Sequence, residues 1–498
     1  MTEAYGKLEE RFRRRARVHD ALAILHWDNA TMMPSGAADG RTDQITELSL
    51  IAREILMAPE TEGLLIEAEA GRAALSPLQS RNLDLMRREH LLATAVPTDL
   101  FEALQRAGAA SEMNWRTARP ANDFASQRPH LEEVFRLTRE TAAVRAEALG
   151  VSPYDAQLEL FEPGLRDADV APVFEDLSEW LPGMIEDILA RQSSQPAPLE
   201  PAGPFPIAAQ KQIGEALMTA LGFDFDNGRL DESAHPFTGG VQDDVRLTTR
   251  YREDSFLEAL MGIVHETGHA LYEQGLPDEW RGQPVGNSGG MALHESQSLV
   301  VEMQLSRGPA FIAHLTPMLT GAFGERAGLD LDNLRALVTR VRRGLIRVDA
   351  DEATYPLHVI LRYRLEKALL AGDLAVSDLP GAWNDTLAEL VGVRPPDDRD
   401  GCLQDIHWMD GAVGYFPTYT LGALAAAQLM AAVRRDIPDL DDRVARGDFA
   451  VFTGWQREKV HRRALSGTTG EIVEDATAAP LSAEAFREHL TARYLGGR

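Results

Sequence analysis

Apolar residues recur at three- and four-residue steps along most of the chain. Segments such as 8–25, 131–148 and 170–191 keep this spacing over several turns, as amphipathic helices do. Alternating patterns are scarce: the clearest is 245–251 (VRLTTRY), and a weaker one lies at 468–473. The pattern therefore predicts a mainly α protein with a small β-sheet.

Proline interrupts this helical pattern at 196–206 (PAPLEPAGPFP), because a proline in a helix interior removes a backbone donor and clashes with the preceding turn. We expect a single catalytic unit over 1–498, with an N-terminal helical part (1–195), a Pro-rich linker (196–206) and a second part (207–498) that carries every motif discussed below. The uncharged stretch 411–433 is long enough to span a bilayer, but its proline, glycines and polar residues favour a buried helix.

Charge and cysteine content exclude several classes of protein. The 498 residues include 50 Lys and Arg against 77 Asp and Glu, a formal net charge of −27. A nucleic-acid-binding protein needs a basic face, and an anionic membrane surface attracts basic segments, so we expect neither partner. The single cysteine, Cys402, allows no internal disulfide and no thiolate metal cluster. Together with an N-terminus that lacks an apolar signal core, this predicts a cytoplasmic protein.

The pattern His265-Glu266-Thr267-Gly268-His269 carries the clearest chemistry. Apolar residues before it mark one face of a helix, so His265 and His269, four residues apart, lie on one face and can bind one metal ion. Glu266 projects beside them, where a metallopeptidase places its general base. Gly268 is unfavourable in a helix interior by about 1 kcal/mol relative to Ala. A close backbone or ligand approach would explain it, as would drift.

A catalytic zinc site needs a third protein ligand and an open position. The segment His294-Glu295-Ser296-Gln297-Ser298 follows a Gly-rich turn and has the character of a helix. Glu295 is the natural third ligand, which predicts one divalent ion per chain on His265, His269 and Glu295. His294 is rotated by about 100° on the helix, so only one of the two neighbours is expected to face the metal. Glu302 is either a partner that holds a ligand histidine or a surface carboxylate.

These motifs, with others in the same order, resemble the carboxypeptidase Taq family of zinc-dependent metallocarboxypeptidases. The resemblance spans nearly the whole chain and implies a largely helical fold with a deep central cleft, a zinc ion and a homodimer. Cobalt and manganese are the alternative metals. The motifs are Trp27-Asp28, Thr31–Pro34, His235-Pro236-Phe237, Asp244–Thr248, HETGH (265–269), HESQS (294–298), Ile346–Asp351, Gly401–Trp408 and Gly414–Tyr419.

The resemblance also suggests roles for late residues. Glu266 is expected to take a proton from the attacking water and deliver it to the leaving amine. Distant relatives, the angiotensin-converting enzyme and thimet oligopeptidase groups, place a His and a Tyr over the zinc. By that resemblance His407 and Tyr415 are the candidates that stabilise the oxyanion. Tyr419 competes with Tyr415, and core packing is the alternative for both rings.

A carboxypeptidase must also recognise a terminal carboxylate, which a guanidinium binds with two hydrogen bonds. Arg347 and Arg246 are the candidates, and Arg347 is preferred. Arg246 could instead pair with Asp244 or Asp351, and Arg347 could instead hold Asp349 or Asp351.

Should neither arginine bind the terminal carboxylate, backbone donors or a Gln404–Tyr419 pair are the remaining candidates.

The function predicted from sequence is a metal-dependent carboxypeptidase that removes the C-terminal residue of peptides. The alternatives are an oligopeptidase or dipeptidyl carboxypeptidase with the same site, and a catalytically dead peptide-binding scaffold.

Overall fold

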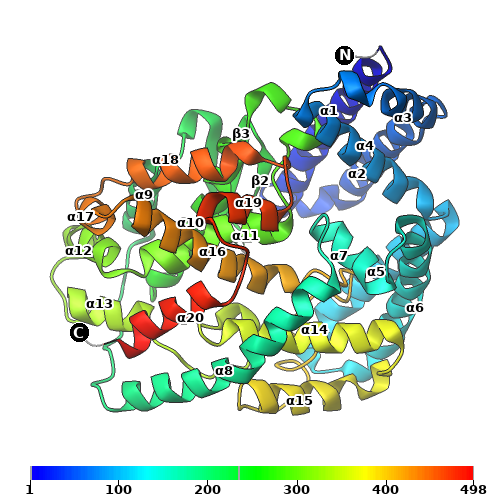
Figure 1. The fold of residues 1–498 in the computed structure, drawn as a ribbon. Helices are drawn as coiled ribbons and strands as arrows, with labels where there is room; N and C mark the ends of the chain where they lie inside the picture. The colour runs from blue at the N-terminus through cyan, green and yellow to red at the C-terminus, as the bar shows by residue number, and fades with distance from the viewer. Residues whose placement is uncertain (1–2, 234–235, 497–498) are drawn as a thin grey trace.

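The structure, a computed structural model, describes residues 3–233 and 236–496, so His235 of the HPF motif lies outside the described residues. Helices dominate the described chain and one small sheet accompanies them, which confirms the predicted mainly α fold (Figure 1).

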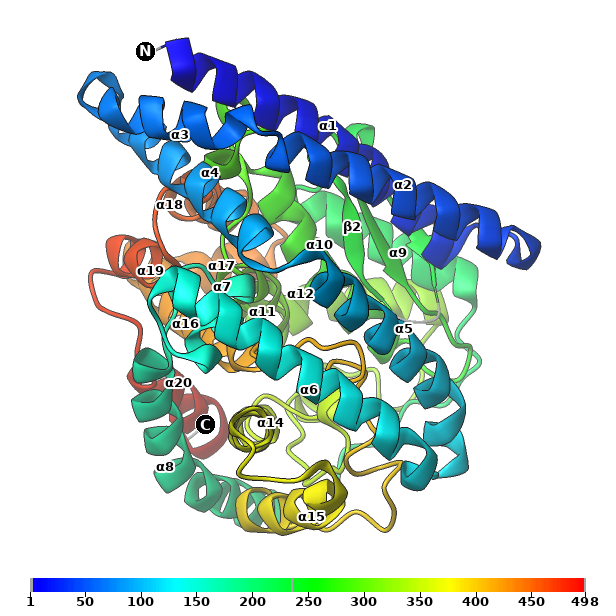
Figure 2. The same ribbon diagram turned by 90° about the vertical axis from the view of Figure 1, so that its right-hand side faces the viewer.

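The N-terminal part is helical up to the Pro-rich segment, and residues 196–206 contain no helix, as their prolines predict. Figure 2 shows α1 and α2 side by side along the upper edge of the molecule. The helices of this part are α1 (Glu3–Thr31), α2 (Ala38–Met57), α3 (Glu60–Ala70), α4 (Pro77–Ala95), α5 (Thr98–Ala121), α6 (Phe124–Leu149), α7 (Pro153–Phe161) and α8 (Asp167–Ser193).

The second part holds the sheet and the motif-bearing helices, with α10 and α11 near the centre of the molecule (Figure 1). Its helices are α9 (Ile207–Leu221), α10 (Leu257–Gln274), α11 (Met291–Leu299), α12 (Pro309–Phe323), α13 (Leu331–Val338), α14 (Tyr355–Ala371), α15 (Leu379–Leu390), α16 (Pro417–Asp436), α17 (Leu440–Ala445), α18 (Ala450–Lys459), α19 (Thr469–Thr477) and α20 (Glu484–Leu490).

The sheet lies directly before α10 in the chain and packs against it. Its strands are β1 (Gly228–Glu232), β2 (Thr238–Val241) and β3 (Asp244–Thr249), in the order β1-β3-β2. The central strand β3 runs parallel to β1 and antiparallel to β2, with Thr238 opposite Leu247. The strand predicted at 245–251 is therefore present, shifted by one or two residues.

The second predicted strand, at 468–473, is wrong. This segment begins α19, because Thr468 and Glu471 form a capping box: each side chain accepts a hydrogen bond from the backbone N–H of the other residue. The cap satisfies two donors that a helix N-terminus otherwise leaves unpaired, and it outweighs the β-propensity of Ile472 and Val473.

One buried core extends across the Pro-rich segment. It joins Phe135 and Phe174 of the N-terminal part to Leu361, Trp383 and Phe416 of the second part. The motif-bearing part therefore shares its packing with α6 and α8.

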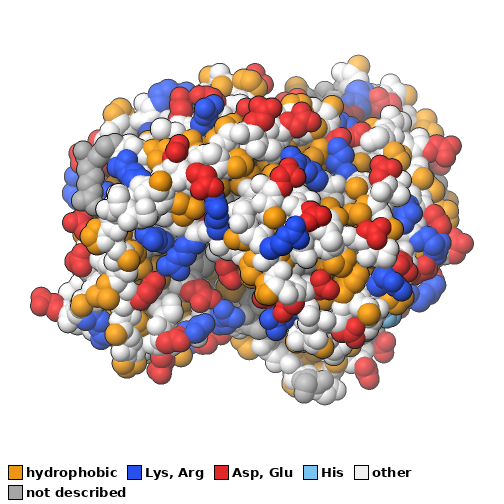
Figure 3. Space-filling model, turned by 90° about the horizontal axis from the view of Figure 1, so that it is seen from below, with side chains coloured by type: hydrophobic (Ala, Val, Ile, Leu, Met, Phe, Trp, Pro, Cys, Tyr) orange, Lys and Arg blue, Asp and Glu red, His pale blue; other side chains and the backbone are white. Residues whose placement is uncertain are grey.

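The uncharged stretch 411–433 forms a loop and most of α16, whose side chains are largely buried inside the protein. None of the helices in the described part of the chain combines the length and the apolar character needed to cross a bilayer. On the face drawn in Figure 3, acidic side chains are scattered among basic and apolar ones, so the negative net charge does not gather in one field there.

Candidate metal centre and active site

The HETGH pattern lies on α10, as predicted, and the HESQS pattern lies on α11. His265, His269 and Glu295 each offer one ligand atom, and these atoms lie within 4.8 Å of one another. The two helices can approach this closely because residue 268 is glycine: a Cβ there would stand 2.3 Å from the carbonyl oxygen of Gln297. The close approach of the two backbones therefore explains why residue 268 is glycine, and drift does not explain it.

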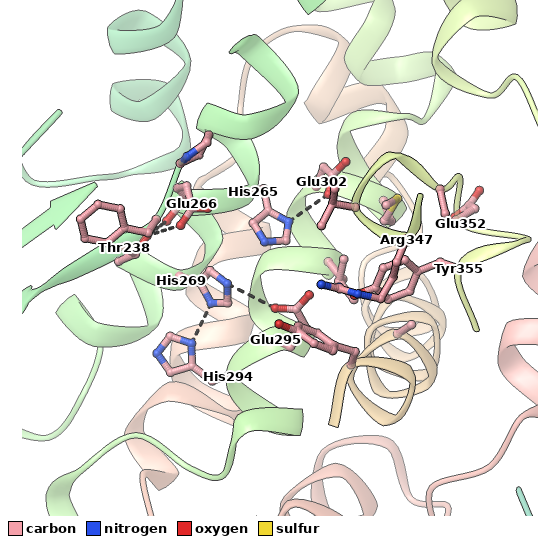
Figure 4. A pocket seen from close by; sticks show the side chains of 18 of the residues that line it. Thr238, His265, Glu266, His269, His294, Glu295, Glu302, Arg347, Glu352 and Tyr355 are labelled. Carbon is pink, nitrogen blue, oxygen red and sulfur yellow. Dashed lines mark hydrogen bonds and ion pairs between the residues drawn. The ribbon is translucent and has the colours of Figure 1, made fainter. Parts of the chain in front are cut away.

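The cluster opens into a cleft of about 790 Å³. The side chains of His265, His269 and Glu295 keep 23%, 14% and 14% of their surface exposed, enough for an ion to be reached from the cleft. Figure 4 shows the three side chains converging, with Glu266 beside them.

His265 is oriented by a buried carboxylate. Its Nδ1 donates to Glu302 Oε2 at 2.9 Å, and Arg307 Nη2 donates to Glu302 Oε1 at 2.6 Å. Burial opposes the charge on Glu302, but Arg307 and His265 outweigh it and lower the pKa of Glu302 to about 2. The alternative that Glu302 is a surface carboxylate is therefore wrong. It lies on a π-helical turn, Val300–Ser306, that continues α11.

His269 is oriented by a second histidine. His269 Nδ1 lies 2.7 Å from His294 Nδ1, and His294 Nε2 lies 2.8 Å from Glu273 Oε1. The other ring nitrogen of His269, Nε2, lies 3.4 Å from Glu295 Oε2. Of the two neighbours on α11, Glu295 thus belongs to the ligand cluster and His294 lies on the far side of His269.

The residues fit a divalent cation by donor type and by charge. Two imidazole nitrogens and one carboxylate oxygen form a donor set that catalytic zinc uses. Burial disfavours a charged His265, yet Glu302, Glu295 and Glu266 together raise the pKa of His265 to about 10. The same negative potential that would hold a proton on this imidazole attracts a metal cation in its place.

Glu266 is nearly buried, and its position is fixed from the sheet. Thr238 Oγ1, on the edge strand β2, donates to Glu266 Oε2 at 2.6 Å. The strand is in turn packed against α1, and the ring of Phe237, directly before the strand, lies with its centroid 4.9 Å from that of Trp27 on α1. The early tryptophan of the sequence therefore supports the strand that holds the carboxylate.

Two tyrosines of the late segment, Tyr415 and Tyr419, line the cleft. Tyr415 Oη lies 3.6 Å from the sulfur of Met291, a weak acceptor, whereas Tyr419 Oη lies 3.2 Å from His407 Nε2. Burial raises the pKa of both tyrosines. Both hydroxyls therefore stay protonated near neutral pH and can donate a hydrogen bond.

His407 is placed differently from the prediction, which had it at the reacting centre. It lies behind Tyr419 and is not among the described residues that line the cleft. Burial, with the charges of Arg347 and Arg362, outweighs the attraction of Asp405 and lowers the pKa of His407 to about 4. A neutral imidazole that carries its proton on Nε2 can donate to the oxygen of Tyr419, which orients that hydroxyl and leaves its own proton free for another acceptor.

Arg347 lines the cleft and is held by partners that the sequence did not reveal. Its Nε and Nη2 donate to Asp405 Oδ1 at 3.0 and 2.8 Å, and its Nη1 donates to Tyr355 Oη at 3.0 Å. The predicted alternative partners, Asp349 and Asp351, do not hold it. A guanidinium has five N–H donors, so one N–H on each terminal nitrogen remains for a ligand.

The remaining two predicted substrate contacts do not reach the cleft. Arg246 pairs with Asp244, which is the alternative noted above for this residue. Gln404 is buried: its oxygen accepts from the backbone N–H of Arg347 and from Arg362, and its amide nitrogen donates to backbone carbonyls. Neither residue is among the described residues that line the cleft.

Sequence reasoning missed four residues that shape the site: Thr238, Glu273, His294 as a partner of His269, and Tyr355. Thr238 follows the HPF motif directly, and Glu273 lies four residues beyond His269 on the same helix. Both positions were therefore visible as neighbours of a motif, but their partners were not. Arg250 and Glu258, which also line the cleft, carry no motif signal.

The comparisons with known proteins agree along the whole chain. The sequence profile of the family described as carboxypeptidase Taq (M32) metallopeptidase matches residues 7–494. "Thermostable carboxypeptidase 1" of Thermus thermophilus is 36% identical, over 99% of this chain and 98% of the relative. "Carboxypeptidase 1" of Bacillus subtilis is 32% identical over 95% of each chain.

Solved structures show the same fold. Trypanosoma cruzi metallocarboxypeptidase 1 superposes with a TM-score of 0.97 at 39% identity, covering 99% of this chain and 100% of that one. The M32 carboxypeptidase of Deinococcus radiodurans superposes with a TM-score of 0.94 at 35% identity, covering 99% of each chain. This chain therefore belongs to the carboxypeptidase Taq (M32) family of metallopeptidases.

Proposed function

We propose that this chain is a metal-dependent carboxypeptidase that hydrolyses the C-terminal residue from peptides. The observation that carries the proposal is the convergence of His265, His269 and Glu295 beside Glu266, in a cleft that also holds the buried Arg347. The names of the relatives favour removal of C-terminal residues over the oligopeptidase alternative.

One zinc ion per chain, or cobalt or manganese in its place, is proposed on His265 Nε2, His269 Nε2 and Glu295. A bound ion of this kind polarises a carbonyl and lowers the pKa of a water molecule. Glu302 and His294 hold the Nδ1 atoms of the two imidazoles, which leaves both Nε2 lone pairs for the ion.

The residues of this chain supply the other steps. Glu266 takes a proton from the attacking water and delivers it to the amine that leaves. Tyr415 and Tyr419 present protonated hydroxyls toward the developing oxyanion. His407 is a positioning residue for Tyr419.

Arg347 is proposed to bind the terminal carboxylate of the substrate with its two remaining N–H groups. Asp405 and the ring of Tyr419, whose centroid lies 4.9 Å from the guanidinium carbon, hold the guanidinium in one orientation. A donor fixed in this way loses little side-chain entropy when substrate binds.

The assembly and compartment are also proposals. We propose a cytoplasmic homodimer, in line with the buried thiol of Cys402 and the resemblance noted from sequence. Light scattering on a size-exclusion column tests the dimer, and a monomer at micromolar concentration would contradict it.

Mass spectrometry of a free-acid peptide and its amidated twin tests the function. With zinc present, the free-acid peptide should lose one residue at a time from its C-terminus, and a chelator should stop the reaction. Release of dipeptides or internal cleavage would favour the oligopeptidase alternative. Lack of any zinc-dependent cleavage would support the dead scaffold.

A further inference from the structure

We propose that His294 and Glu273 form a relay that fixes the tautomer of His269 and thereby positions its Nε2 for the metal ion. This inference rests on the proposed metal site. It assigns His294, a neighbour of the ligand Glu295 on α11, a role toward His269 on the other helix.

The relay is a continuous chain of short contacts. His269 Nδ1 lies 2.7 Å from His294 Nδ1, with ring centroids 4.6 Å apart, and His294 Nε2 lies 2.8 Å from Glu273 Oε1. The side chains of His294 and Glu273 are only 17% and 25% exposed. Tyr272 packs on the ring of His294, with centroids 5.4 Å apart, and limits its rotation.

The contacts determine where the protons lie. His269 Nε2 must keep its lone pair to bind a metal, so a neutral His269 carries its proton on Nδ1. This proton is donated to His294 Nδ1, which must then be an acceptor. A neutral His294 accordingly carries its own proton on Nε2, where it is donated to the carboxylate of Glu273. Each nitrogen in the relay has one consistent role.

Two other roles for His294 fit the contacts less well. A metal ligand needs a free lone pair, but Nδ1 of His294 accepts from His269 and Nε2 donates to Glu273. A substrate contact likewise needs an unoccupied nitrogen. His294 lines the cleft, yet both of its polar atoms face protein partners.

The two imidazole ligands are thus held by hydrogen-bonded chains of different length. His265 donates directly to the carboxylate of Glu302, which Arg307 pins in place. His269 reaches its carboxylate, Glu273, only through the intervening ring of His294. The longer chain depends on His294 accepting at Nδ1, so a substitution that removes this acceptor breaks the chain.

The test is zinc affinity, measured on the full-length protein by competition with a chelator of known affinity. His294→Leu removes the acceptor and should weaken zinc binding about 10–100-fold, the usual effect of losing a partner of a metal-binding histidine. His294→Asn places a carbonyl oxygen near the former Nδ1 and should restore most of the affinity. Glu273→Gln keeps an acceptor but removes the charge, and should give an intermediate loss.

His461→Leu is the matched control. His461 is also a buried histidine that packs on Tyr272 and contacts α11, through Gln297, but it touches none of the three proposed ligands. This variant should bind zinc like the unaltered protein. A loss equal to that of His294→Leu would show that general packing, and not the relay, sets the affinity.

The outcomes separate the relay from the proposed function. If the unaltered protein retains no zinc, the metal site itself is wrong. If it retains zinc and His294→Leu binds equally tightly, the relay alone is wrong. Loss of stoichiometric zinc in His294→Asn would make His294 a ligand and would also overturn the relay. Should His294→Leu fail to fold, the zinc affinities of His294→Asn and Glu273→Gln still decide.

A spectroscopic reading checks the proton positions independently of affinity. In zinc-loaded protein labelled with 15N in its histidines, the relay predicts a protonated Nδ1 on His269 and an unprotonated Nδ1 on His294. Assignment of the resonances uses the His269→Asn and His294→Asn variants. The reverse arrangement on His294 would contradict the relay.

Discussion

The two walls of the cleft are built in different ways. The metal wall consists of His265, Glu266, His269 and Glu295, which come from α10 and the next helix, α11. The tyrosine wall consists of Arg347, Tyr355, Tyr415 and Tyr419, which come from separate segments up to 72 residues apart and meet only in the fold. In Figure 4, Arg347 and Tyr355 lie on one side of Glu295 and Glu266 lies on the other side.

The difference teaches what each wall does. Helix geometry fixes the spacing of His265 and His269, and the close packing of α11 against α10 at Gly268 adds Glu295, so the metal wall suits a task that requires rigid ligand distances. The tyrosine wall depends on pairings such as Arg347 with Asp405 and Tyr419 with His407. We therefore expect variants of the tyrosine wall to change turnover or recognition while the metal stays bound.

The largest effect is expected for Glu266→Gln. An amide cannot accept the proton of the attacking water, so kcat should fall about 10²–10⁴-fold. Zinc content should be unchanged, because Glu266 is not one of the three ligands. Steady-state kinetics with element analysis on the same sample measure both, and a near-normal kcat with zinc bound would exclude Glu266 as the base.

Tyr415→Phe should lower kcat about 10²-fold, since removing one oxyanion donor has an effect of this order. Tyr419→Phe should cost less, because the Tyr419 hydroxyl already contacts His407 in this structure. Zinc content should again stay at one per chain. A larger loss in Tyr419→Phe would reverse the assignment of the two hydroxyls.

Arg347→Met should reduce kcat/KM for free-acid peptides about 10–100-fold. This loss corresponds to the free energy of about 1.5–3 kcal/mol that a hydrogen bond to a charged group contributes. Amidated peptides lack the charged partner, so the substitution should hardly change their kcat/KM. The penalties of the substitution and of amidation should therefore not add. Arg246→Met, on a residue paired with Asp244 away from the cleft, is the matched control. Equal slowing of both substrates by Arg347→Met would leave it only a structural role with Asp405.

The smallest effect is expected for Thr238→Val, which keeps the shape of the side chain but removes its donor to Glu266. We expect kcat to fall about 3–10-fold with little change in KM, as for the loss of one modest hydrogen bond. Thr238→Ser should restore most of the rate. If the Ser variant is as slow as the Val variant, packing of the Thr238 methyl group against the site explains the effect.

The sequence predicted what depends on spacing along one helix. His265 and His269 followed from the four-residue step. Gly268 stood out by the cost of glycine in a helix, but only the fold decided between a close approach and drift. The error at 468–473 was avoidable, because Thr468 and Glu471 stand at the spacing of a capping box.

Apart from the approach of Glu295 to the two histidines, contacts between distant segments were beyond the sequence pattern. Arg347 and Asp405 lie 58 residues apart, and no periodicity links them. Gln404, predicted with Tyr419 as a substitute for the two arginines, instead accepts from the backbone of Arg347 and from Arg362, and only the packing decides which partner such an amide has. The position of His407, which contacts Tyr419 and is not among the described residues that line the cleft, likewise follows from the fold of its loop.

Anomalous diffraction from a crystal of the zinc-loaded protein, recorded at the zinc edge, tests the central assignment most directly. The site predicts one peak per chain, about 2.0–2.2 Å from His265 Nε2, His269 Nε2 and a carboxylate oxygen of Glu295. A peak bound by His294 instead of His269, or a peak away from these three residues, would contradict it.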